Sequence, residues 1–322
     1  MLVTASRVRT DGWVVQGGRP IKSLAICRLP RNHGLPHCLM RRMGGHLQGP
    51  AAPGVDSAED STPNPRPRDA FLTCSTLVQE VWLVFALSLG RDAVEAGIVF
   101  VAALTSGQTL PQQQAVLVGS QAPGRPLIDL SFQLVSLIAA LMPVALVFHF
   151  LKRSGESPND IGLDGSRPAP DTAGGIALAL LLGGSGLALY LLARAAGANL
   201  TVIPETLPSV WWKVPVLLLS AVQNGVLEEI LVVGYLLHRL RQIGWSDSRA
   251  LTVSALLRAS YHLYQGLGGF AGNAAMGLIF GRLYQRYGRL LPLVLAHSLI
   301  DATTFVGYAV LVGHVSWIPI PH

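Results

Sequence analysis

Long apolar stretches separated by short polar segments dominate the chain from residue 71 onward. A stretch of about 20 apolar residues can cross a ~30 Å hydrocarbon layer as a helix. The pattern therefore predicts an all-α polytopic transmembrane helix bundle of about seven spans. The predicted spans are 71–90, 127–151, 173–193, 209–238, 250–265, 271–285 and 290–312. Between the first two spans, the pattern of residues 92–105 predicts an amphipathic helix. This helix would lie in the interface or pack against the bundle.

The stretch 209–238 is too long for one straight span. Thirty helical residues extend ~45 Å, which exceeds the hydrocarbon thickness. We expect this helix to tilt, to break near Gly225, or to protrude from the membrane.

Residues 1–70 differ from the rest, because they are rich in Arg, Pro and Gly and contain no apolar run that could span. We predict a disordered basic tail here. The alternative expectation is that the true start codon lies further along the chain. Residues 71–322 are predicted to form the transmembrane helical domain under either expectation.

Composition and charge support a membrane protein. Half of the residues are hydrophobic and 13% are charged, against roughly 25% charged in soluble domains. The net charge of +6 could suit nucleic acid, but the cations lie at the ends of apolar stretches and form no separate basic domain. We therefore expect membrane lipid, and no nucleic acid, around this protein.

The distribution of Lys and Arg predicts the orientation. If the spans alternate, the basic segments fall on one side of the membrane, and the positive-inside rule makes that side cytoplasmic. We thus expect an integral protein of a bacterial plasma membrane with a cytoplasmic N-terminus. The basic segments are the tail, the loop with Lys152, Arg153 and Arg167, the loop with Arg239, Arg241 and Arg249, and the loop with Arg282, Arg286 and Arg289.

Six ionisable residues lie inside the predicted C-terminal spans, where each costs ~2.5–3.5 kcal/mol on insertion scales. Counted from the cytoplasmic cations at ~1.5 Å per residue, those on three different helices reach similar depths, ~12–20 Å. Spacing of four residues puts His297 and Asp301 on one helix face, and likewise Arg258 with His262 and Asn224 with Glu228. The six residues are Glu228, Glu229, Arg258, His262, His297 and Asp301.

Such a set of side chains can hydrolyse a peptide bond. A desolvated carboxylate can act as a general base on water, and histidines can hold that water and stabilise the oxyanion. A metal is the alternative, with Glu228, His262 and His297 as zinc ligands and water in the open position. The helix-borne HExxH pattern of zincins is absent.

The run Glu228–Tyr235, then His262, then His297 with Asp301, resembles the CPBP family of CAAX-protease and bacteriocin-processing membrane peptidases. The family pattern is EExxxR, FxxxH and HxxxN or HxxxD on successive helices. The resemblance covers about residues 209–312, which would form the catalytic core. It implies an intramembrane endopeptidase that acts on membrane-associated peptides or proteins and needs no cofactor, although zinc remains an alternative.

The resemblance also implies roles for single residues. Glu228 would activate water, His262 would help hold that water, and Glu229 would be a supporting carboxylate. His297 and Asp301 occupy the oxyanion positions, where Asp301 would have to be protonated or would act by orienting His297.

This sequence departs from the family pattern in two places. The motif arginine falls at Val233, and the aromatic residue falls at Arg258. We hypothesise that the departures compensate, so that Arg258 supplies from the neighbouring helix the cation that position 233 lacks.

Each feature also has a structural interpretation. Arg258 could form a purely structural ion pair with Glu228 and Glu229, His297 could only hydrogen-bond Asp301, and His262 could be a packed residue of the interface. A catalytically inactive membrane scaffold or immunity protein on the same fold is therefore the alternative function. A transporter would need broken helices in two related halves, and the sequence contains no such repeat.

Overall fold

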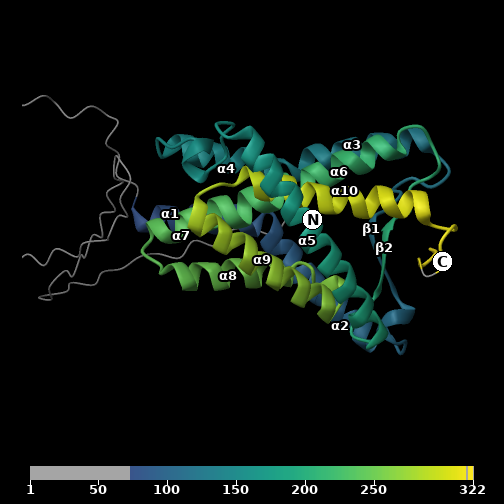
Figure 1. The fold of residues 1–322 in the computed structure, drawn as a ribbon. Coiled ribbons are helices and arrows are strands. Elements are labelled where there is room, and N and C mark those ends of the chain that lie inside the picture. The colour runs from purple at the N-terminus through teal and green to yellow at the C-terminus, as the bar shows by residue number, and fades with distance from the viewer. Residues whose placement is uncertain (1–72, 317, 322) are drawn as a thin grey trace, which may run out of the picture.

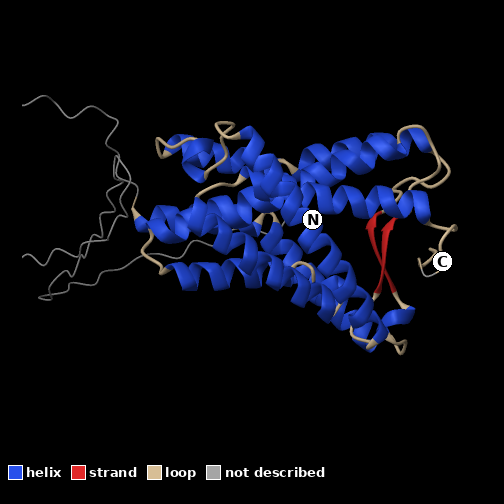
Figure 2. Ribbon diagram, in the orientation of Figure 1, coloured by secondary structure: helices blue, strands red, loops and turns tan. Residues whose placement is uncertain are grey.

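The computed structural model describes residues 73–316 and 318–321. Most of these residues are helical (Figure 2). The predicted basic tail, 1–70, lies outside the described residues. The first half contains α1 (Cys74–Ala86), α2 (Leu89–Thr105), α3 (Pro126–Ala140), α4 (Met142–Arg153) and α5 (Pro168–Ala195). The second contains α6 (Lys213–Glu228), the π-helix η3 (Glu229–Tyr235), α7 (Leu236–Gln242), α8 (Asp247–Ser260), α9 (Leu267–Tyr287) and α10 (Leu291–Leu311).

Four helices of the described chain are long and apolar enough to cross a membrane. They are Pro126–Arg153, Pro168–Ala195, Lys213–Gln242 and Leu291–Leu311, which correspond to four of the predicted spans. The predicted spans 71–90 and 250–265 contain helices of only 13 and 14 residues, which are too short to cross. Helix α9 has 21 residues, but it is not apolar enough to be counted as a span. The membrane helices are therefore confirmed, whereas the count of seven is not.

The expectation of a purely helical fold is wrong in one detail. Strands β1 (Gln114–Val118) and β2 (Thr201–Glu205) pair in parallel between α10 and α2 (Figure 1). Both lie between predicted spans, in segments for which the sequence analysis predicts no helix or strand. Their β-branched and apolar residues suit a half-buried strand.

The helix from Lys213 to Gln242 neither breaks at Gly225 nor ends there. A Cβ atom at Gly225 would lie only 3.0 Å from the carbonyl oxygen of Val294 and the amide nitrogen of Ser298 on α10. The glycine thus permits the close packing of α6 against α10 that small residues provide in membrane bundles.

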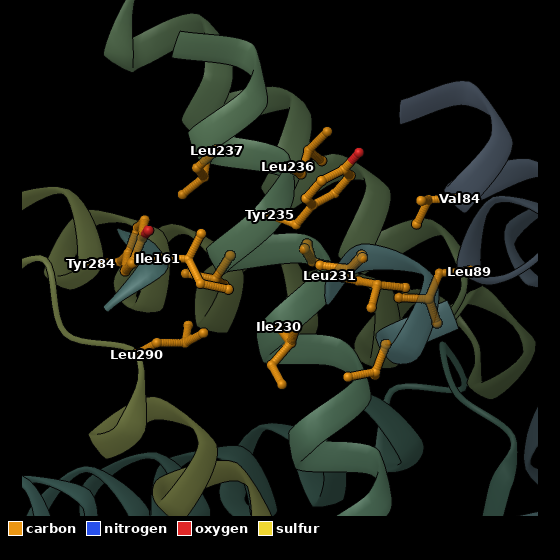
Figure 3. Packing of buried hydrophobic residues seen from close by; sticks show 14 of the residues in the cluster. Val84, Leu89, Ile161, Ile230, Leu231, Tyr235, Leu236, Leu237, Tyr284 and Leu290 are labelled. Atoms are coloured by element: carbon orange, nitrogen blue, oxygen red, sulfur yellow. The ribbon is translucent and has the colours of Figure 1, made fainter. Parts of the chain in front are cut away.

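The centre of the fold is the π-helix η3, in which every residue is buried. Side chains from many other parts of the chain surround it, including Val84, Ile161, Tyr284 and Leu290 (Figure 3). Single-turn π-helices occur mostly inside α-helices and often at functional sites. This one begins at Glu229 and so follows Glu228 directly.

Ion pairs link the described basic loops at one end of the bundle. Arg239 contacts Glu156 at 2.5 Å, and Arg153 pairs with Glu80 of α1. Arg289 contacts Asp164 at 2.5 Å. The location of these ion pairs at one end of the bundle agrees with the prediction that the basic segments lie on one side of the membrane. That this side is cytoplasmic stays a prediction.

Candidate active site

The two adjacent glutamates lie where α6 becomes η3, and both are buried. Glu228 is 8% exposed and Glu229 is fully buried. Adjacent residues of an α-helix point ~100° apart, so the two side chains face different neighbours. Here α8, η3 and α10 enclose the junction, and each carboxylate contacts a different group of side chains.

Glu228 contacts residues of α8 and of the turn that follows it. Its Oε2 accepts a hydrogen bond from the Tyr261 hydroxyl at 2.8 Å and lies 3.3 Å from Nη2 of Arg258. Its Oε1 lies 3.8 Å from Nε2 of His262. One carboxylate oxygen is therefore held by protein donors, and the other faces an imidazole across a gap.

His262 lies just beyond the end of α8, in the turn before η4 (Leu263–Gln265). Its Nδ1 is 3.0 Å from the carbonyl oxygen of Arg258. Because a carbonyl only accepts, Nδ1 carries the proton in this contact. In the neutral ring Nε2 is then an acceptor, and it is this nitrogen that faces Glu228.

Glu229, Arg258 and His297 form a second, buried group, of which only His297 reaches the cavity. Oε1 of Glu229 lies 2.8 Å from Nη2 of Arg258 and 2.8 Å from Nδ1 of His297. Arg258 is fully buried and its Nη2 is 3.0 Å from Nδ1 of His297. The same guanidinium nitrogen thus contacts both glutamates and one histidine, which supports the predicted compensation for Val233.

Asp301 lies one helical turn beyond His297 on α10. Its Oδ2 is 3.8 Å from Nε2 of His297, which is too long for a hydrogen bond. Asn224 of α6 donates a hydrogen bond from Nδ2 to the same oxygen at 3.0 Å. Asp301 is therefore fixed by α6, and the simple intrahelical hydrogen bond to His297 is not formed.

These side chains open onto a cavity of about 460 Å³. Glu228, His262, His297, Asp301 and Asn224 all line it. Glu229 and Arg258 do not line it and lie behind this layer. A volume of this size suits a small molecule or a few peptide residues.

Sequence reasoning missed several residues of this cavity. Tyr261 is one of them, although its position directly before the motif histidine is a usable signal. Asp92 and Glu95 of α2 also line the cavity. The prediction that residues 92–105 lie in the interface or pack against the bundle does not say which side chains face a cavity.

The described residues contain no group of three or more His, Cys, Asp or Glu side chains arranged to hold a metal ion. The guanidinium of Arg258 also places a positive charge 3.3 Å from Glu228, the first ligand of the zinc alternative. This donor set does not fit a zinc site. That the protein requires no metal stays a prediction.

Comparison with known proteins identifies the same part of the chain. Residues 210–303 match the family model described as "Type II CAAX prenyl endopeptidase Rce1-like". No match was found among curated proteins or among solved structures. The matched range lies within the predicted core, 209–312, and contains all three motifs, so the resemblance to the CAAX-protease family is confirmed.

Proposed function

On the premise that residues 210–303 belong to the Rce1-like family of type II CAAX prenyl endopeptidases, we propose that this protein is an intramembrane endopeptidase that uses glutamate-activated water. Its substrate is a peptide or protein segment in or beside the membrane. The observation that carries the proposal is the convergence of Glu228, His262 and His297, from three different helical segments, on one cavity.

In this proposal Glu228 is the general base. Its Oε1 and Nε2 of His262 are 3.8 Å apart, and both are free to accept a proton from a water molecule bound between them. Tyr261 and Arg258 hold the other carboxylate oxygen, so that Oε1 keeps its orientation. General bases positioned in this way contribute typically about 10²–10⁴-fold to the rate.

His297 is the proposed oxyanion donor. Its Nδ1 faces Glu229 and Arg258, which fixes the ring, and its Nε2 faces the cavity beside Asp301. A proton carried on Nε2 can then make a hydrogen bond to the negative oxygen of the tetrahedral intermediate, and this proton stays on the ring. Asp301, held by Asn224, lies on the same wall and would be protonated during this step.

The reaction balances without any other reactant. Glu228 takes a proton from water as the water oxygen attacks the peptide carbonyl carbon, and the negative charge moves to the carbonyl oxygen. The intermediate then collapses, the carbon–nitrogen bond breaks, and the proton on Glu228 passes to the leaving nitrogen. The products are a new carboxyl terminus and a new amine.

Glu229 and Arg258 act as positioning residues in this scheme, because neither lines the cavity. A lone buried carboxylate is costly, and a hydrogen-bonded cation offsets that cost. The single charge of Arg258 offsets part of the negative charge of the two glutamates and leaves one oxygen of Glu228 for water.

Quantitative proteomics tests the proposal. Membranes from cells that express the wild type or Glu228→Gln would be compared for new peptide termini. We expect termini within or near membrane segments that occur only with the wild type, at equal protein levels. Identical termini in both membranes would favour the inactive scaffold or immunity protein instead.

A further inference from the structure

Helix α2 supplies a wall of the cavity that does not belong to the residues matched by the family model. Leu89, Asp92, Ala96 and Val99 line the cavity. The last three follow Leu89 by three, seven and ten residues, which places all four on one helix face. Only Asp92 among these four carries a charge.

The carboxylate of Asp92 makes no hydrogen bond or ion pair with a described side chain, although the neighbouring Arg91 attracts it electrostatically. Glu95, which also lines the cavity, differs, because its Oε1 pairs with Nε of Arg91 at 2.7 Å. The pair from Arg91 to Glu95 leaves Asp92 as the carboxylate of α2 that is available to a ligand.

The remaining lining residues make the cavity acidic. Four carboxylates line it, those of Asp92, Glu95, Glu228 and Asp301, and neither Lys nor Arg is among the lining residues. The nearest buried cation, Arg258, is already in contact with both motif glutamates. A positive group that enters the cavity is therefore attracted, and a negative group is repelled.

Asp92 is an exposed residue of α2. Val94, Ile98 and Val101 do not line the cavity and are 59–64% exposed on the outer surface of the same helix. Because Asp92 lines the cavity and is exposed, a ligand in the cavity can reach its carboxylate.

We propose that Asp92 determines substrate specificity by binding a Lys or Arg side chain close to the scissile bond. The substrate is then a membrane-associated peptide with a basic side chain close to the bond that is cleaved. This inference rests on the proposed peptidase function and adds the class of substrate.

The test uses the purified full-length protein in liposomes and a defined library of apolar peptides. Each peptide carries Lys, Gln or Glu at one position, and cleavage is read by mass spectrometry with Glu228→Gln as the blank. We expect cleavage that depends on Glu228, with peptides carrying Lys cut about tenfold faster than those carrying Glu.

Substitutions of Asp92 then locate the preference. Asp92→Asn, which keeps the side-chain shape, should remove the preference, and Asp92→Lys should reverse it toward peptides carrying Glu. The matched control is Asp247→Asn, because Asp247 is half exposed, pairs with Arg241 and does not line the cavity. It should leave the preference unchanged.

Two results overturn the proposal in different ways. Cleavage that depends on Glu228 but shows no preference for basic residues, or keeps that preference in Asp92→Asn, refutes the role of Asp92 and leaves the peptidase intact. Absence of any Glu228-dependent cleavage across the library would count against the peptidase function itself.

Discussion

Replacing Arg258 tests the charge arrangement at the heart of the site. The substitution Arg258→Phe restores the aromatic residue of the family motif but removes the one Lys or Arg side chain in contact with Glu228 and Glu229 among the described residues. Glu229 is fully buried and Glu228 nearly so, so two neighbouring carboxylates lose their guanidinium partner. Breaking a buried pair in this way costs about 3–5 kcal/mol, which lowers the ratio of folded to unfolded protein by roughly two to four powers of ten.

The double variant Val233→Arg with Arg258→Phe supplies the matched test. It returns the cation to the motif position, four residues after Glu229, and frees the space that the Arg258 side chain occupies. Val233→Arg alone should destabilise the protein, because Val233 is fully buried and a second guanidinium would crowd the core.

The assay is a double-mutant cycle on thermal stability in detergent and on peptide cleavage in liposomes. We expect each single variant to lose stability and activity and the double variant to recover part of both. The expected coupling is at least about 1 kcal/mol. The reasoning is refuted if Arg258→Phe folds and cleaves normally, or if the effects of the two substitutions simply add.

Three further predictions concern separate contacts. Tyr261→Phe removes a hydrogen bond to the proposed base and should slow cleavage about tenfold with a small loss of stability, as kinetics and thermal melting would measure. Gly225→Val should lower both the melting temperature and the activity, because the larger side chain forces α6 away from α10. The control Gly186→Val should change neither, because a Cβ atom there meets nothing within 4 Å. Equal effects of the two substitutions would contradict this packing. At Asp164, the hydrogen bond from Arg289 holds the pKa of the carboxyl well below its ordinary value. The stability from this pair is complete above the unfolded pKa of ~3.9 and declines as the pH falls below it. The melting temperature of Asp164→Asn should therefore differ more from the wild type at pH 6 than at pH 3, and a constant difference would be inconsistent with the pair.

The site could be predicted further than the fold that holds it. Spacing of four residues and equal depth in the membrane placed Glu228, His262 and His297 together, because regular helices fix both quantities. The same reasoning pointed to Arg258 as the compensating cation. It could not give Asp92, since the helix before the matched segment contributes to the cavity only through tertiary packing.

Other features depend on contacts that a sequence does not display. The run from Ile230 to Val233 is uniformly apolar and gives no sign that the helix widens there, because the π-helix is set by the elements that enclose it. The strand 114–118 is short, and the nearby Pro111 and Gly119 are residues typical of turns, so the sequence there does not indicate a strand. By contrast, the change from α3 to α4 at Leu141 could have been inferred from Pro143, which cannot continue a helix undisturbed.

The most direct test of the central claim is the cleavage rate of purified Glu228→Gln in liposomes, compared with the wild type on one peptide that the wild type cuts. The substitution preserves shape and removes the base, so we predict a loss of about 10²–10⁴-fold in rate with an unchanged melting temperature. A folded Glu228→Gln protein that cleaves within a few fold of the wild type would contradict the claim that this carboxylate activates water.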